Sequence, residues 1–239
     1  MKNLYLVIGA SSGYGKAIAE ALNDNLDNYV VTAQRRSGIN SIEHDVKSPE
    51  SWLNLSNHLT QLQQTHKIKG IIYSTGIAAD VAPINQKDRL SAISVIDVNV
   101  IGLMRALELA GVVLESGGVF INVGSIAYRK NYYGGGEYCA SKAAQLTLMR
   151  TARIEGLSKR VRYCTINPGL GYTEFQKTRF NGNEAKAQKV TEGLRVLDAA
   201  DVANAVLFML NVPEHVCISE LEITPSEQAE HGEDIRKYR

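Results

Sequence analysis

The sequence lacks the features that mark several large classes of protein. Its 26 Lys and Arg against 25 Asp and Glu leave a net charge of only +1, so no overall field attracts nucleic acid or an acidic membrane. Its three cysteines, Cys139, Cys164 and Cys217, lie far apart and form no CxxC pair. This argues against a disulfide or zinc framework and for reduced thiols in a cytoplasmic protein. No apolar run is long enough to span a bilayer.

Short apolar runs alternate with longer amphipathic segments along the 239 residues. The first run breaks at once into a glycine turn, which is typical of a buried strand rather than a signal peptide. Continuous apolar strands separated by helices predict a parallel sheet covered on both faces, as in a doubly wound α/β fold of the Rossmann type. The strands are expected at 4–8, 29–33, 70–75, 119–123, 160–166 and 220–224, and the helices at 13–26, 50–65, 87–114, 138–157 and 199–210.

No linker divides the chain, so residues 1–226 are expected to form one domain. It would include a flap at about 172–192 and be followed by a polar, loosely held tail at 227–239. Only nine residues without helical period separate Arg35 from Asp45, where a doubly wound fold usually inserts a crossover helix between the second and third strands. This helix is predicted to be absent.

The segment IGASSGYG, residues 8–15, joins the first strand to the first helix. Gly9 permits a tight turn, while Gly13 and Gly15 allow the backbone to approach a pyrophosphate at the helix N-terminus. Ser11, Ser12 and Tyr14 share this turn and are further candidates for cofactor binding. The alternative is a structural turn that binds nothing.

The end of the second strand indicates which nicotinamide cofactor is bound. Arg35 lies 20 residues after Gly15 and is followed by Arg36, with no acid at this turn. An arginine can hold a ribose 2'-phosphate, whereas a carboxylate would hold a 2'-hydroxyl, so NADP is favoured over NAD. The alternative is that both arginines are merely solvated. Asp45 and Val46, at the end of the third strand, are expected to meet the adenine.

Four tyrosines lie in the segment 124–142, and one of them has the spacing that proton transfer requires. A phenol with a pKa of about 10 is a poor acid at neutral pH unless a nearby cation assists it. Residues four apart share a helix face, and only Tyr138 has a lysine at that spacing, Lys142. A unit charge at about 4 Å in an effective dielectric near 20 contributes roughly 4 kcal/mol, comparable to about three pKa units.

A Tyr-x-x-x-Lys pair alone is common on helix surfaces, but here it occurs together with several other motifs. The chain resembles the short-chain dehydrogenase/reductase family over nearly its whole length, in IGASSGYG, YSTG (73–76), Asn99, Ser125, Tyr138 with Lys142, and NPG (167–169). The resemblance implies a seven-stranded parallel sheet, a homotetramer (or homodimer) and hydride transfer between a nicotinamide and a carbonyl carbon. Further cofactor contacts are implied for Thr75, Gly76, Pro168, Gly169, Gly171 and Thr173.

The resemblance also implies a role for each member of a catalytic tetrad. Ser125 would hydrogen-bond the substrate oxygen and Tyr138 would transfer the proton. Lys142 would lower the pKa of Tyr138 and bind ribose hydroxyls, and Asn99 would hold a relay water.

The C-terminal third is similar to the NADP-dependent 3-hydroxy acid dehydrogenases of this family, in residues 168–187 and 212–228. A small anionic substrate would need a cation, and Arg129, Lys130 and Arg179 are the candidates, although each can equally be a solvated surface charge. Tyr132 and Tyr133 are candidate pocket walls. No metal is expected, because His215 has no partner at ligand spacing.

The chain departs from the family pattern in two places. Ile8 stands where a threonine usually ties the first strand to the fourth, and Ser74 or Thr75 is predicted to supply another polar tie. The loop after NPG is one residue shorter than in the 3-hydroxy acid dehydrogenases, which places Gly171 at a position usually held by a branched residue. Two other functions stay open: a reductase of a neutral ketone, and an NADP-binding sensor without turnover.

Overall fold

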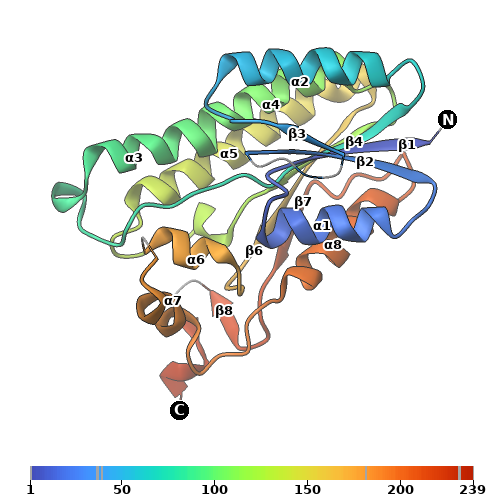
Figure 1. Ribbon diagram of the computed structural model, residues 1–239. Coiled ribbons are helices and arrows are strands. Elements are labelled where there is room, and N and C mark those ends of the chain that lie inside the picture. Colours follow the sequence, from blue (N-terminus) through green and yellow to red (C-terminus); the bar gives the residue numbers. More distant parts are fainter. Residues whose placement is uncertain (1, 36–37, 39, 181, 231–232, 239) are drawn as a thin grey trace.

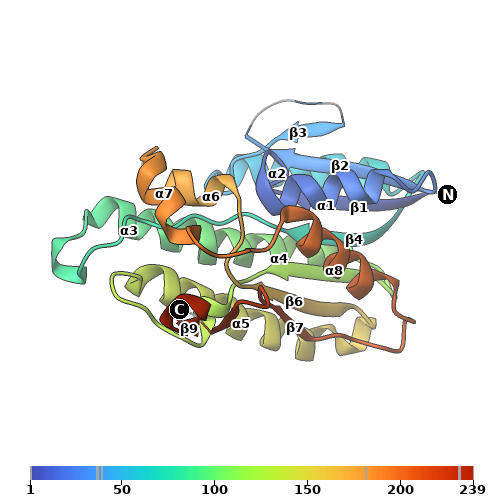
Figure 2. The same cartoon turned by 90° about the horizontal axis from the view of Figure 1, so that it is seen from below.

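The computed structural model describes residues 2–238 except 36, 37, 39, 181, 231 and 232. Seven parallel strands form one sheet, as the family resemblance implies, and their order is β3-β2-β1-β4-β5-β6-β7 (Figures 1 and 2). The strand order reverses between β1 and β4, and doubly wound sheets bind ligands at the carboxyl ends of the strands beside such a point. The strands are β1 Asn3–Ile8, β2 Asn28–Gln34, β3 Ser41–Glu43, β4 Lys67–Tyr73, β5 Val119–Val123, β6 Arg162–Pro168 and β7 Glu220–Ile223.

Helices cover both faces of the sheet because side chains alternate along each strand. In β1, Leu6 and Ile8 join a core that includes residues of α2, α4 and α5, whereas Val7 joins a second core that includes residues of α1 and α8. Both faces are therefore buried, which explains the continuous apolar runs in the sequence. The covering helices are α1 Gly13–Asn23, α2 Pro49–Leu62, α4 Gly102–Val113, α5 Gly136–Glu155 and α8 Ala199–Asn211.

The helix predicted at 87–114 is composite. α3 Arg89–Ile96 continues through a π-helical turn, Asp97–Ile101, into α4. Such turns often occur at functional sites, and this one carries Asn99. The whole helix, Arg89–Val113, is long and apolar enough to cross a membrane, which corrects the sequence analysis, but a third of its most apolar window (33%) is buried inside the protein. Core helices of soluble proteins pass the same test of length and composition.

Where the structure describes it, the connection between β2 and β3 is a loop, as predicted. None of the residues that the structure describes between these two strands is helical, and β3 pairs in parallel directly with β2. The third strand is shorter than expected, because it ends at Glu43. Asp45 and Val46 therefore lie just beyond it.

The C-terminal tail is not loosely held, which corrects the expectation for its described residues. β8 Gln228–Glu230 and β9 Glu233–Asp234 form an antiparallel pair, and the 3-10 helix η5 Ile235–Tyr238 follows. Arg236 donates hydrogen bonds to the carbonyl oxygens of Val190 and Glu192 at 3.3 and 3.2 Å. The tail thereby braces the predicted flap, which contains α6 Glu174–Arg179 and α7 Glu184–Thr191.

Two of the cysteines are neighbours in space although they are far apart in sequence. The Sγ atoms of Cys164 and Cys217 lie 3.8 Å apart, because the segment before β7 runs beside β6. Both are free thiols, and Cys217 is exposed whereas Cys164 is buried.

Candidate active site

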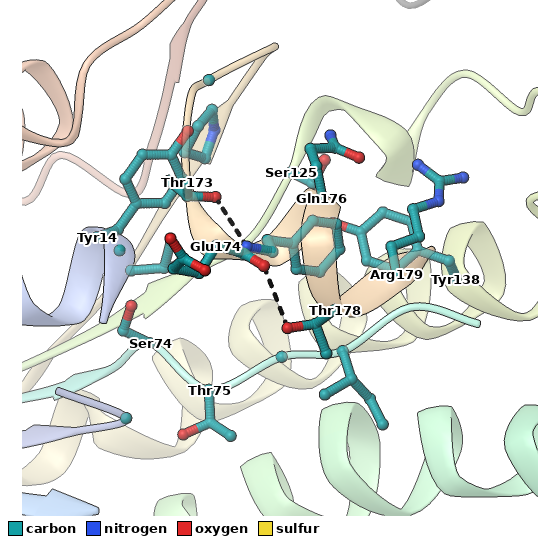
Figure 3. Close-up of a pocket in the computed structure, with 18 of the residues that line it drawn as sticks. Tyr14, Ser74, Thr75, Ser125, Tyr138, Thr173, Glu174, Gln176, Thr178 and Arg179 are labelled. Carbon is teal, nitrogen blue, oxygen red and sulfur yellow. Dashed lines mark hydrogen bonds between the residues drawn. The ribbon is translucent and has the colours of Figure 1, made fainter. Parts of the chain in front are cut away.

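A cavity of about 710 Å³ lies at the carboxyl ends of the strands, within the size range of small-molecule sites. Its walls come from the loops after β1, β2, β3, β4, β5 and β6, from α6 and α7, and from the tail. Figure 3 shows part of its lining. Segments that are remote in sequence therefore meet at one chamber.

The glycine turn at one end of the cavity is packed so closely that side chains would not fit. Gly9 has φ +88°, and a Cβ on Gly15 would lie 2.2 Å from the carbonyl oxygen of Gly9. α1 begins at Gly13, and the Ser12 side chain makes no capping hydrogen bond. The first N–H groups of α1 are therefore available to a phosphate group.

The predicted side-chain tie between the first and fourth strands is not made by Thr75. Its Oγ1 is buried without a hydrogen-bond partner among the described residues, and it faces Gly9, on which a Cβ would lie 2.5 Å away. The main chain joins the two segments instead, since the N–H of Ser74 donates to the Ile8 carbonyl at 2.9 Å. The Thr75 hydroxyl is thus an unused polar group on the cavity wall.

At the other end of the cavity, after β2, an arginine stands where a carboxylate would hydrogen-bond a ribose 2'-hydroxyl. Arg35 lines this end and is exposed, whereas Arg36 lies outside the described residues. Asp45 and Val46 line the same end, and so does Lys47, which the sequence analysis missed. Lys47 follows Val46 directly, so a search for cations beside the third strand could have found it.

Ser125 and Tyr138 meet at the centre of the cavity. Ser125 follows β5, and its N–H donates to Asn167 Oδ1 at 3.1 Å. Tyr138 lies in the first turn of α5, is only 9% exposed, and lies near enough to the Ser125 hydroxyl for that group to lower its pKa. Two hydroxyl groups from different elements can therefore contact one substrate oxygen.

The pKa of Tyr138 differs from the expectation in the ligand-free protein. Burial raises it, while the hydrogen bond from Ser125 and the positive charge of Arg179 oppose that effect. Lys142 is also buried, which lowers its own pKa to about 7. A lysine with that pKa is charged in only about half of the molecules at neutral pH, so it lowers the pKa of Tyr138 less than a permanent cation would.

Lys142 and Asn99 lie behind Tyr138, as the helix spacing predicts for the lysine. Lys142 Nζ is 5.7 Å from the centroid of the Tyr138 ring. The side-chain amide of Asn99 exchanges hydrogen bonds with the main chain of Ile77, both at 2.9 Å, and donates to Ser141 Oγ at 2.9 Å. Asn99 is fully buried, so its side chain links α5 to the loop after β4.

Of the three cations that were predicted to bind an anionic substrate, Arg179 is the one that lines the cavity. It is 8% exposed, and its Nη2 donates to the Tyr132 hydroxyl at 2.7 Å. The guanidinium lies 5.0 Å from the Tyr132 ring centroid, and both residues line the cavity. Figure 3 shows Arg179 close to Tyr138.

The other two cations that were predicted to bind an anionic substrate, Arg129 and Lys130, form ion pairs outside the cavity, which corrects the prediction. Arg129 donates to both carboxylate oxygens of Glu222 at 2.9 and 2.5 Å and to Glu230 at 2.7 Å. Lys130 forms an ion pair with Glu230 at 2.7 Å. Tyr133 is 77% exposed. Within the described part of the chain, none of these three predicted residues lines the cavity.

The short loop after Asn167-Pro168-Gly169 is held by a residue that the sequence analysis missed. Gln228 Oε1 accepts a hydrogen bond from the Leu170 N–H at 2.8 Å. A Cβ on Gly171 would lie 1.9 Å from the Tyr14 hydroxyl, so the Tyr14 side chain occupies the space of a branched residue. Thr173 Oγ1 accepts from the Phe175 N–H at 3.4 Å (Figure 3).

These residues together fit a dinucleotide. The glycine turn and the free N–H groups of α1 suit a pyrophosphate, and the unpartnered Thr75 hydroxyl lies beside them. Arg35 and Lys47 provide positive charge at the second and third strands. The half-buried Ser125 and the buried Tyr138 then stand where a substrate carbonyl or hydroxyl group would react.

Such a site defines a dinucleotide-dependent oxidoreductase. A family model described as short chain dehydrogenase matches residues 3–184, and the chain belongs to this family. The fold and the family resemblance inferred from the sequence are thereby confirmed.

Several named proteins are similar over nearly their whole length. A "Probable NADP-dependent dehydrogenase" of Haemophilus influenzae is 29% identical, with 98% of each chain covered. An "NADP-dependent 3-hydroxy acid dehydrogenase" of Schizosaccharomyces pombe is 30% identical, with 97% of this chain and 96% of that protein covered. A solved structure, the closed form of serine dehydrogenase complexed with NADP+, has a TM-score of 0.88 at 29% identity and covers 95% of this chain and 96% of its own.

Proposed function

We propose that this short-chain dehydrogenase uses NADP(H) to interconvert a small anionic hydroxy compound, of the 3-hydroxy acid type, with its aldehyde or ketone. The observation that carries the proposal is the arrangement of Ser125, Tyr138 and Arg179. Two hydroxyl groups that can contact one oxygen lie beside a buried guanidinium in the same cavity. The names of the relatives support both the cofactor and the substrate class.

The chain's own residues manage the proton and the position of the substrate. Bound NADPH supplies a hydride to the carbonyl carbon. Ser125 hydrogen-bonds the carbonyl oxygen, and the Tyr138 phenol gives its proton to that oxygen, so the carbonyl becomes a hydroxyl group. In the oxidation direction, the Tyr138 phenolate removes the same proton. Lys142, when charged, stabilises this phenolate.

Arg179 is the residue that would select an anion. Its Nε is buried and has no hydrogen-bond partner among the described residues, although Nη2 is bound to Tyr132. Leaving a buried donor unpaired is costly. A carboxylate in the cavity would compensate the charge of this guanidinium, so anionic substrates are favoured over neutral ketones.

The cofactor contacts follow from the same cavity. The N–H groups of α1 and the glycine turn would hold the pyrophosphate. Arg35 and Lys47 would hold the 2'-phosphate, because both line the adenine end. Strict use of NAD would contradict this assignment.

The decisive experiment is a screen of NADP reduction with short 3-hydroxy acids, matched neutral alcohols and serine, together with NADPH oxidation by the corresponding carbonyl compounds. Arg179→Met is expected to raise KM for the acids about tenfold or more, while rates with neutral compounds change little, because a charged hydrogen bond contributes about 1.5–3 kcal/mol. Arg129→Met is the matched control, since Arg129 does not line the cavity. Equal losses with acids and neutral compounds would favour the neutral-ketone reductase.

Replacing Tyr138 by Phe separates an enzyme from an NADP-binding sensor. Turnover is expected to fall by a factor of about 100 or more, because proton transfer by a positioned side chain contributes about 10²–10⁴. NADP affinity should change little. A variant that keeps full biological function would identify the protein as a sensor.

We also propose that the enzyme works in the cytoplasm as a homotetramer or homodimer. Large apolar side chains of α3, α4 and the π-helical turn between them are exposed in the single chain, at Leu90, Ile93, Ile96, Ile101, Met104 and Val112. Contacts with another subunit would cover such a surface. Light scattering after size-exclusion chromatography without detergent tests this, and a monomer would refute it.

A further inference from the structure

Gln145 is a fully buried polar residue next to the catalytic group, and neither the proposed mechanism nor the family resemblance uses it. It lies on α5, three residues after Lys142 and seven after Tyr138, and is 0% exposed. At helical spacing these three residues share one face. A buried carboxamide needs hydrogen-bond partners, and the partners of Gln145 are both parts of the catalytic group.

The Gln145 amide joins Lys142 to the main chain of Asn99. Lys142 Nζ donates to Gln145 Oε1 at 3.0 Å, and Gln145 Nε2 donates to the Asn99 carbonyl oxygen at 2.7 Å. The orientation of the amide follows from its partners, because an ammonium group can only donate and a carbonyl oxygen can only accept. Both bonds are buried, so they break rarely.

This bridge engages the carbonyl oxygen of Asn99, the residue to which the family resemblance assigns a relay water. A side chain thereby connects this oxygen to Lys142 directly. A water can accept one proton and release another, whereas a carboxamide has no proton that it exchanges readily near neutral pH. The other side of Lys142 faces the cavity, which both Lys142 and Tyr138 line.

We propose that Gln145 replaces the relay water between Lys142 and Asn99, holds Lys142 in place as a positioning residue, and closes the inward route for protons. The proton exchanged at Tyr138 then enters and leaves through the cavity. The kinetic part of this inference rests on the proposed function, because it takes Tyr138 as the proton donor and acceptor. The structural part, a direct amide bridge, does not.

Gln145 has two proposed roles, to position Lys142 and to exclude a water molecule, and two substitutions test them separately. Gln145→Leu keeps most of the volume and removes the acceptor of Lys142. With less stabilisation of its charged form, Lys142 stabilises the Tyr138 phenolate less. We expect kcat for alcohol oxidation to fall about tenfold, with KM within about twofold. The acidic limb of the pH profile should move to higher pH, because oxidation requires the phenolate.

Gln145→Ala instead leaves room for water beside the Asn99 carbonyl. We expect it to recover at least a third of the wild-type kcat and to show a solvent deuterium isotope effect that differs from the wild type. Gln61→Leu, on the exposed surface of α2, is the matched control and should change neither quantity. Thermal melts and NADP titrations show whether each variant is folded and binds the cofactor. An unshifted pH profile in folded Gln145→Leu would overturn the positioning role.

Crystal structures of the wild type and Gln145→Ala with NADP test the structural part without any substrate. The expected result is a direct amide bridge in the wild type and a water between Lys142 Nζ and the Asn99 oxygen in Gln145→Ala. A water at this place in the wild type, with Gln145 turned away, would refute the inference. If the wild type oxidises no hydroxy acid, the proposed function fails, and the crystal structures still decide the role of Gln145.

Discussion

The contact between Gly171 and Tyr14 predicts that one added methyl group destabilises the protein. A Cβ on Gly171 would lie 1.9 Å from the Tyr14 hydroxyl and 3.2 Å from the Leu197 carbonyl oxygen. The main chain here cannot retreat easily, because the N–H of Tyr172 donates to the Leu197 carbonyl at 2.9 Å and the N–H of Leu197 donates to the Leu170 carbonyl at 3.0 Å. The Tyr14 ring must move instead.

Gly171→Ala should therefore lower the free energy of unfolding by about 1–3 kcal/mol, the usual cost of overpacking. For a chain of this size that corresponds to a fall in Tm of roughly 3–10 °C. Gly171 does not have a positive φ, so alanine is compatible with the backbone and the effect isolates the clash. Thermal and urea unfolding of the NADP-free protein measure it.

A double-mutant cycle identifies Tyr14 as the cause. Tyr14→Phe removes the hydroxyl, after which the closest ring atom, Cζ, would lie 3.0 Å from the new Cβ. Gly171→Ala should then cost less in the Tyr14→Phe background, with a coupling energy of about 1 kcal/mol or more. If Gly171→Ala is as stable as the wild type, or if the two changes are additive within about 0.3 kcal/mol, the packing of Tyr14 on this loop is refuted.

Three further outcomes are expected. Gly15→Ala should abolish NADP binding or folding, because its Cβ would lie 2.2 Å from the main-chain oxygen of Gly9. Gly111→Ala is the control and should keep the wild-type Tm or raise it, because a Cβ there would have no atom within 4 Å. Equal effects of the two substitutions in binding and melting assays would contradict this prediction. Burial lowers the pKa of Lys142 from 10.5 to about 7, so between these values the unfolded chain binds more protons and stability rises with pH. Lys142→Met should thus be more stable than the wild type in urea at pH 6 and lose this advantage steadily as the pH rises from about 7 towards 10.5, and a constant difference would refute the shift. Cys217, the exposed thiol, has its pKa lowered by a hydrogen bond from its buried neighbour. A thiol reagent should modify one cysteine quickly at pH 7, and a fast phase that survives Cys217→Ser would contradict this.

Local patterns were enough to predict the fold and the centre of the site. The period of the apolar residues predicts which segments are strands and which are helices, and the parallel sheet follows because both faces must be covered. The Tyr138–Lys142 spacing is a property of one helix, so it survives any tertiary arrangement. The missing crossover helix was predictable as well, since too few residues separate Arg35 from Asp45.

The predictions that failed concern side chains whose partners are remote in the sequence. Arg129 and Arg179 are equivalent cations in the sequence, yet Glu222 and Glu230 engage Arg129, while α6 carries Arg179 into the cavity. Nothing near Arg129 in the chain indicates these acids, which lie 93 and 101 residues away. Gln228 shows the same limit, because it holds Leu170 from 58 residues away.

The sequence by itself determined the glycine turn and the tyrosine–lysine pair, because each lies within a few turns of chain. It also determined the parallel sheet, because the local periods of its apolar residues predict strands and helices that alternate, and such strands must be covered on both faces. Only the tertiary structure decided which cation serves the cavity, and that Gln145 bridges Lys142 and Asn99. It also decided the sign of the pKa shift of Tyr138, because burial raises that pKa. Desolvation and ion pairing depend on everything that surrounds a group, and that environment exists only once distant segments have packed together.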